Sequence, residues 1–129
     1  MPKILFADDD EDLRKWAVFT LRKEGHEVIE CADGAEAKLL IDREMPDLVI
    51  SDTEMPHHDG YEVVEHAFMH VFKGKAIPTI QISGDDINVE KSHATHKLLK
   101  PFGTNELLAL VTYVFETEAA RKAPTPEPQ

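Results

Sequence analysis

The sequence predicts an α/β fold, a doubly wound five-stranded parallel sheet, because two kinds of apolar segment alternate along the chain. Short continuous apolar runs suit strands that are buried on both faces, as in a parallel sheet. Between these runs, apolar residues recur at intervals of three and four, the spacing of an amphipathic helix. A strand-helix order repeated about five times indicates parallel strands joined by right-handed crossovers.

The predicted strands are the five short apolar runs. They lie at residues 4–7, 28–29, 48–50, 77–82 and 97–100. In a doubly wound sheet, the carboxyl ends of parallel strands form the crevice that holds a ligand. Residues that directly follow these runs are therefore the first candidates for a functional site.

The predicted helices are stretches with helical spacing of apolar residues. They lie at residues 13–21, 37–41, 61–72 and 107–115. Asp10 or Asp12 is expected to cap the first helix, and Thr104 or Asn105 the last, because these side chains accept hydrogen bonds from free backbone N–H groups. The segment 85–95 has no readable period.

The composition indicates one soluble domain with an acidic surface. The chain has 129 residues, with 14 Lys and Arg against 25 Asp and Glu, a net charge of −11. This charge disfavours direct binding to nucleic acid, which needs a basic face.

No signal peptide or membrane-spanning run is present, and a single cysteine, Cys31, is compatible with a reducing compartment, so a cytoplasmic location is expected. Residues 1–118 are the predicted domain, and residues 119–129, with three prolines, a disordered tail or a cut linker.

Ionisable and hydroxyl side chains gather where the predicted strands end. Asp8 and Asp9 follow the first strand, Asp52 the third, Ser83 the fourth and Lys100 the fifth. Three carboxylates in one crevice repel each other unless a cation joins them. A hard divalent cation with oxygen ligands, Mg²⁺ or Mn²⁺, is the expected neutraliser.

This set of residues is suited to one reaction, the transfer of a phosphoryl group to a carboxylate. A carboxylate is a weak nucleophile, but a metal ion and a lysine ammonium can stabilise phosphoryl transfer to it. The product on Asp52 is an acyl phosphate, and its formation and hydrolysis make a timed switch. The residues therefore predict that Asp52 accepts a phosphoryl group.

Four segments carry a family resemblance. They read KILFADDDEDL, DLVISDTEMPHHDGYEVVE, IPTIQISG and KLLKPFGTNEL. With these segments in this order, the chain resembles the receiver domain of bacterial response regulators over about residues 3–118. The resemblance implies a flavodoxin-like (βα)5 receiver fold and a role in two-component signalling.

The resemblance also implies roles for the residues of the acidic site. Asp52 looks like the phosphoacceptor. Asp8 and Asp9 look like the acidic pair, with Asp9 the direct metal ligand and the backbone carbonyl of Glu54 another ligand. Together with Asp52, these groups would hold the Mg²⁺.

Further residues match the family's switch machinery. Ser83 looks like the switch hydroxyl, and Lys100 like the lysine that bridges phosphate and carboxylate. Pro101 is expected to follow a cis peptide bond. The other expected modulators of the phosphorylated state are Glu54, Gly84, Asp85 and Lys97.

The resemblance implies partners rather than substrates. A histidine kinase or a histidine phosphotransfer protein would supply the phosphoryl group, and a downstream effector protein or domain would read the switch, with a homodimer possible. In this family, partner choice depends on the first helix, here residues 12–19. The chain is not expected to be an enzyme beyond its own phosphoryl transfer and dephosphorylation.

The sequence departs from the family pattern in two places. Ser83 and Lys100 are only 17 positions apart (100 − 83), fewer than receivers usually have. The fourth helix region is therefore expected to be shortened. Lys97 stands where receivers often carry an aromatic residue that moves inward on phosphorylation. We expect an output surface that differs from the usual one.

Three alternatives exist for the function of the chain and its histidine pair. A pseudo-receiver that binds partners independently of phosphorylation keeps the fold without the switch. A phosphatase with an aspartyl-phosphate intermediate is disfavoured, because Glu54 stands where such enzymes place a second aspartate and no cap domain is available. His66 and His70 share a helix face at a spacing that zinc sites use, but no third ligand is obvious nearby, so a surface pair is expected.

Overall fold

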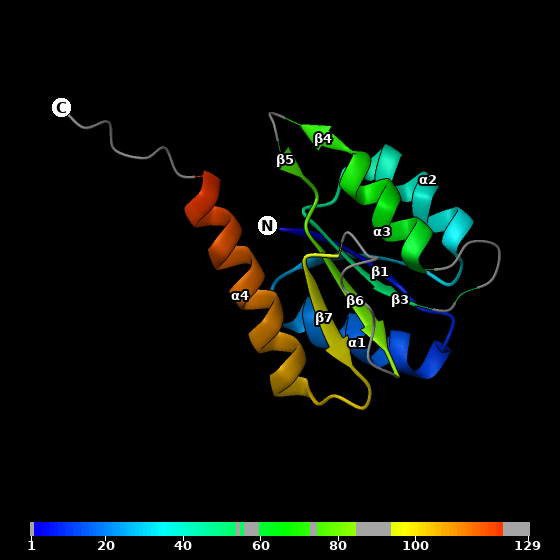
Figure 1. Cartoon of the computed structure of the whole chain (residues 1–129). Helices are drawn as coiled ribbons and strands as arrows, with labels where there is room; N and C mark the ends of the chain where they lie inside the picture. Colours follow the sequence, from blue (N-terminus) through cyan, green and yellow to red (C-terminus); the bar gives the residue numbers. More distant parts are fainter. Residues whose placement is uncertain (1, 54, 56–59, 73–74, 85–93, 123–129) are drawn as a thin grey trace.

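The computed structural model of the chain describes residues 2–53, 55, 60–72, 75–84 and 94–122. Its centre is a five-stranded sheet in the order β2-β1-β3-β6-β7, and every neighbouring pair is parallel (Figure 1). The strands are β1 (Lys3–Ala7), β2 (Glu27–Cys31), β3 (Leu48–Asp52), β6 (Thr79–Ser83) and β7 (His96–Leu99). The chain builds outwards from β1 in both directions, so the predicted doubly wound fold is confirmed, with its switch point between β1 and β3.

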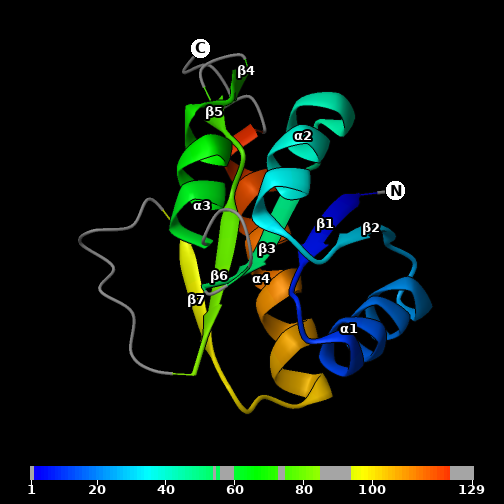
Figure 2. The same cartoon turned by 90° about the vertical axis from the view of Figure 1, so that its right-hand side faces the viewer.

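Four helices in the described part of the chain cover the two faces of the sheet. They are α1 (Glu11–Lys23), α2 (Gly34–Glu44), α3 (Gly60–Met69) and α4 (Thr104–Lys122). In both views, α1 and α4 lie on one face and α2 and α3 on the other (Figures 1 and 2).

Each face of the sheet has its own hydrophobic core, because successive side chains of a strand point to opposite faces. Ile4 and Phe6 of β1 belong to the core under α1 and α4. Leu5 and Ala7, the alternate residues, belong to the core under α2 and α3. These β1 residues are fully buried, as the continuous apolar run predicted.

The helix starts follow local capping chemistry. Asp10 accepts a hydrogen bond from the Leu13 N–H at 3.1 Å, which confirms one of the two candidates for the cap of α1. The prediction for the last helix was wrong, because Thr104 and Asn105 both lie inside α4. Gly103 precedes that helix, and its N–H donates to Glu106 Oε1 at 3.2 Å, so a first-turn glutamate replaces the expected cap.

The third helix is shorter than its apolar spacing predicted. It ends at Met69, and Val71–Phe72 instead forms strand β4, which pairs antiparallel with β5 (Lys75–Ala76). β-Branched and aromatic residues favour such extended pairing when the helix has already ended. The fourth sheet strand starts at Thr79 rather than at residue 77, because Pro78 has no N–H to donate to the ladder.

The segment between β6 and β7, where the fourth helix region was expected, is short, as predicted. Twelve positions, 84 to 95 (96 − 83 − 1), separate β6 from β7. The predicted modulator Asp85 and the rest of 85–93 lie outside the described residues.

At the carboxyl end, α4 continues to Lys122, four positions past the predicted domain end at 118. The division into a domain and a tail stays a prediction. In the part of the chain that the structure describes, no helix is both long and apolar enough to span a membrane.

Candidate functional site

The parallel sheet brings five of the predicted site residues to one edge. Asp8 and Asp9 follow β1, Asp52 ends β3, Ser83 ends β6 and Lys100 follows β7. These strands are neighbours in the order β1-β3-β6-β7, so their carboxyl ends meet at the switch point of the fold.

The three aspartates form a compact cluster of carboxylates. Asp8, Asp9 and Asp52 each offer an oxygen, and these oxygens lie within 4.8 Å of one another. Asp9 is exposed, whereas Asp8 is fully buried and Asp52 is 7% exposed. Such a group, open on one side and buried on the other, has the oxygen donors that hard divalent cations bind.

One carboxylate oxygen of the cluster lacks a hydrogen-bond partner among the described residues. Asp8 Oδ1 accepts from the Asp10 N–H at 2.9 Å, but Asp8 Oδ2 is buried and receives no hydrogen bond from them. Buried polar atoms in folded proteins nearly always have a partner. An oxygen left open inside a group of three carboxylates therefore fits a metal ligand, and the residues present fit Mg²⁺.

Lys100 supplies the positive charge of the site. Its Nζ lies 3.5 Å from Asp52 Oδ1 and 3.6 Å from Asp8 Oδ2. Its backbone N–H donates to the Ser83 carbonyl at 2.8 Å, and the bond to Pro101 is cis, as expected. Burial lowers the pKa of the Lys100 ammonium, but the charges of Asp8 and Asp52 outweigh this and leave the pKa above its ordinary value.

The Asp8 carboxyl has a strongly perturbed affinity for protons. Burial raises its pKa from 3.8 to about 6, against the lowering effect of the Asp10 N–H hydrogen bond. The charge of Asp52 raises this pKa further, and the charge of Lys100 opposes the rise. The ionised cluster is therefore electrostatically costly when no cation is bound.

Thr53 and Arg14, which were not predicted as site residues, hold the ends of these strands in place. The Thr53 N–H donates to Asp52 Oδ1 at 2.9 Å, and the Thr53 hydroxyl donates to the Ile82 carbonyl at 2.7 Å. Arg14 of α1 donates from Nη1 to the Asp8 carbonyl at 2.8 Å. Their main partners are backbone carbonyls, which leave no trace in residue spacing, so sequence reasoning missed them.

The other predicted site residues are placed as follows. Ser83 is buried, and Gly84 and Pro101 are exposed. Lys97 is exposed on β7, in register with Gln81 of β6. Glu54 lies outside the described residues.

Comparison with known proteins places the chain in a family. The model of the response regulator receiver domain matches residues 4–112. The chain belongs to the response regulator receiver domain family. Receivers of this family are signalling modules of two-component systems, and the recognition from the four sequence segments is confirmed.

Solved receivers share both sequence and fold with this chain. The chemotaxis response regulator CheY4 of Vibrio cholerae is 32% identical with a TM-score of 0.79, and the match covers 88% of this chain and 98% of that one. The receiver domain of the Francisella response regulator 1452 is 27% identical with a TM-score of 0.81, covering 92% and 99%. The receiver domain of the hybrid histidine kinase CckA is 34% identical with a TM-score of 0.71, covering 86% and 96%.

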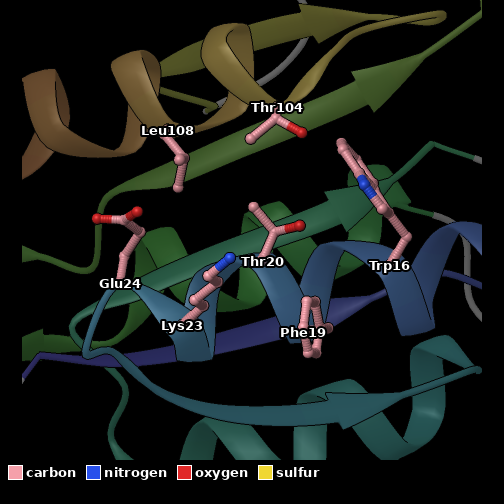
Figure 3. Close-up of a pocket in the computed structure, with 7 residues that line it drawn as sticks. All are labelled: Trp16, Phe19, Thr20, Lys23, Glu24, Thr104 and Leu108. Atoms are coloured by element: carbon pink, nitrogen blue, oxygen red, sulfur yellow. The ribbon is translucent and has the colours of Figure 1, made fainter.

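A groove of about 270 Å³ lies between α1 and α4 (Figure 3). It is lined by Trp16, Phe19, Thr20, Lys23, Glu24, Thr104 and Leu108. Phe19 is 65% exposed, and the Trp16 ring packs against Phe102 with centroids 5.9 Å apart. Both helices start close to the acidic site, since α1 begins two residues after Asp9 (11 − 9) and α4 four residues after Lys100 (104 − 100).

Proposed function

We propose that this receiver accepts a phosphoryl group on Asp52 in a Mg²⁺-dependent reaction and acts as a conformational switch. The observation that carries the proposal is the position of the Lys100 ammonium, 3.5 Å from Asp52 and 3.6 Å from Asp8 within one cluster of carboxylates. A cation between an acceptor carboxylate and its acidic neighbour is placed to hold an incoming phosphoryl group.

Asp8, Asp9, Asp52 and the Glu54 carbonyl would hold the Mg²⁺. When bound, the ion supplies charge that neutralises the carboxylates and the phosphoryl oxygens. The open Asp8 Oδ2 and the raised pKa of its carboxyl support this, since both indicate a buried negative charge without sufficient compensation. Mn²⁺, which also prefers oxygen ligands, is the expected substitute.

With the metal site filled, the reaction joins Asp52, as a carboxylate, to a phosphorylated donor. A carboxylate oxygen of Asp52 attacks the phosphorus of a phosphohistidine, the phosphorus–nitrogen bond breaks, and its electron pair leaves with the imidazole. Lys100 pairs with the transferred phosphoryl oxygens, and the Ser83 hydroxyl donates to one of them. In the reverse half of the cycle, water attacks the phosphorus, and Asp52 leaves as a carboxylate together with inorganic phosphate.

The proposed phosphoryl donor is a histidine kinase or a histidine phosphotransfer protein in the cytoplasm. The groove between α1 and α4 is the proposed docking surface, because both helices begin beside the acidic site and Phe19 offers an exposed aromatic contact (Figure 3). A net charge of −11 favours a partner with a basic face. A downstream effector or a second copy of the chain would read the phosphorylated state.

Intact-mass measurement after incubation with acetyl phosphate and Mg²⁺ tests the proposal. We expect one phosphoryl adduct in the native chain, none in Asp52→Asn, and none when EDTA removes the metal. Asp12→Asn is the matched control, because Asp12 is an exposed aspartate of the first turn of α1 and should leave the adduct unchanged. A native chain without any adduct would instead favour a phosphorylation-independent pseudo-receiver.

A further inference from the structure

His66 of α3, His70 just after its end and Asp42 of α2 meet away from the acidic site. His66 Nε2 lies 2.8 Å from Asp42 Oδ1, and His70 Nε2 lies 3.3 Å from the same oxygen. Their imidazole rings have centroids 6.4 Å apart. The contacts with Asp42 put both rings on the side that packs against α2. The two helices lie side by side in both views (Figures 1 and 2).

The sequence lacked a third ligand for this histidine pair, and the fold provides one. Asp42 is 24 positions before His66 (66 − 42), so only the packing of α2 against α3 brings the carboxylate to the rings. All three side chains are partly exposed, at 53% for Asp42, 30% for His66 and 25% for His70. A metal ion from solvent can therefore reach them. The three donor atoms do not all lie within 4.8 Å of one another, so the imidazoles must turn to share one ion.

We propose that Asp42, His66 and His70 form a binding site for Zn²⁺ or a similar late first-row divalent metal. Imidazole nitrogen and carboxylate oxygen are the ligands that such ions prefer, and three protein ligands leave a fourth, tetrahedral position for water. The nitrogen of each ring that faces the carboxylate is Nε2, which leaves Nδ1 free to donate a hydrogen bond outward.

The site is chemically separate from the acidic cluster at the strand ends. Mg²⁺ prefers oxygen ligands and keeps several waters, so it has little reason to bind two imidazoles. Within the residues that the structure describes, the side chains that contact the Asp42 carboxylate are His66 and His70. Metal binding replaces the two Nε2 contacts to Asp42 by bonds from the three side chains to one ion.

The expected consequence is a metal link between α2 and α3. An ion that binds the folded chain and not the unfolded one stabilises it by mass action. Because α3 is the next described element after β3, which ends at Asp52, this link restrains the helix that comes next after the proposed acceptor.

Isothermal titration with Zn²⁺ in the presence of saturating Mg²⁺ tests the site, since Mg²⁺ occupies the acidic cluster. We expect one zinc per chain, and binding at least about tenfold weaker in Asp42→Asn, His66→Asn and His70→Asn. His96→Asn is the matched control, because His96 is a partly buried histidine on β7, packed against Tyr113, and should leave the affinity unchanged. The thermal midpoint of the native chain should rise with Zn²⁺, and that of the three variants should not.

Substitution of Zn²⁺ by Co²⁺ gives an independent readout of the ligands. We expect the visible absorption of a tetrahedral Co²⁺ complex in the native chain and in His96→Asn, and its loss in Asp42→Asn. Equal zinc affinity in the native chain and the three variants would overturn the proposal, as would a cobalt spectrum that survives Asp42→Asn. Either outcome leaves the proposed phosphorylation of Asp52 untouched, because that reaction is measured in Mg²⁺ alone.

Discussion

Replacing Asp8 by asparagine should stabilise the fold when no divalent cation is present. Asparagine keeps an oxygen that can accept from the Asp10 N–H, as Asp8 Oδ1 does now, but it carries no charge. The substitution therefore removes the charge of a fully buried group whose second oxygen receives no hydrogen bond. The effect should be seen as a higher free energy of unfolding in EDTA at pH 7.

The size of the expected gain in unfolding free energy follows from the pKa of the Asp8 carboxyl. Its pKa in the folded chain is about 6 against an ordinary value of 3.8, a difference of about 2 units. At 1.36 kcal/mol per unit, ionising Asp8 costs the fold at most about 3 kcal/mol at pH 7. This cost already includes the favourable charge of Lys100, so we expect a net gain of about 1–3 kcal/mol from Asp8→Asn.

The sign of the pH dependence is opposite to that of a salt-bridged carboxylate. The folded chain binds more protons at Asp8 than the unfolded chain between about pH 4 and pH 6, so this contribution to stability is lost as the pH rises through that window. The difference in unfolding free energy between Asp8→Asn and the native chain should be near zero at pH 4 and reach its full value at pH 7.

Urea denaturation at pH 4, 5, 6 and 7, in EDTA and in Mg²⁺, measures this difference. Saturating Mg²⁺ should stabilise the native chain and have little effect on Asp8→Asn, since the ion offsets the same charge. A variant that is less stable than the native chain at pH 7 in EDTA would refute the reasoning, and so would a difference that does not change with pH.

Three further predictions concern residues around the site. Arg14→Met should lower the unfolding free energy by about 1–3 kcal/mol, because it leaves the Asp8 carbonyl without its charged donor; urea denaturation measures this. Cys31 should react with iodoacetamide at pH 8 far more slowly in the native chain than in urea, because burial raises the pKa of its thiol to about 12. Substituting Glu54 or Asp85 should change the rate at which the phosphoryl adduct decays, measured by intact mass after removal of the donor.

Each of these predictions has an outcome that contradicts it. An Arg14→Met variant as stable as the native chain would mean that the guanidinium contributes nothing net at the end of β1. Equal alkylation rates of Cys31 in buffer and in urea would mean that its thiol is accessible in the fold. Identical adduct lifetimes in the native chain and in the variants at Glu54 and Asp85 would mean that neither side chain affects the rate of dephosphorylation.

The sheet and its acidic edge were predictable because their signals are local. A strand buried on both faces must be apolar throughout, so β1 and β3 can be read directly as runs. In a parallel sheet, the residues after such runs share one edge, so Asp8, Asp52 and Lys100 could be assembled without coordinates. Asp10 could be predicted as one of two candidate caps for the same reason, since its partner lies three residues away.

The features that were not predicted depend on contacts that the spacing of residues in the sequence does not encode. Helical periodicity continues through Val71 and Phe72, and only pairing with residues 75–76 makes them a strand. The meeting of Asp42 with His66 is set by how α2 and α3 pack. Arg14 holds a backbone carbonyl, which every residue type offers, so no sequence pattern marks it.

Locating the phosphoryl group on the chain tests the central claim most directly. After incubation with acetyl phosphate and Mg²⁺, borohydride reduces an aspartyl phosphate to homoserine, and peptide mass mapping then shows which position has changed. We expect a single reduced position, Asp52, and no reduction there when Mg²⁺ is omitted. Reduction at another carboxylate, or none in a chain shown to be folded and saturated with Mg²⁺, would contradict it.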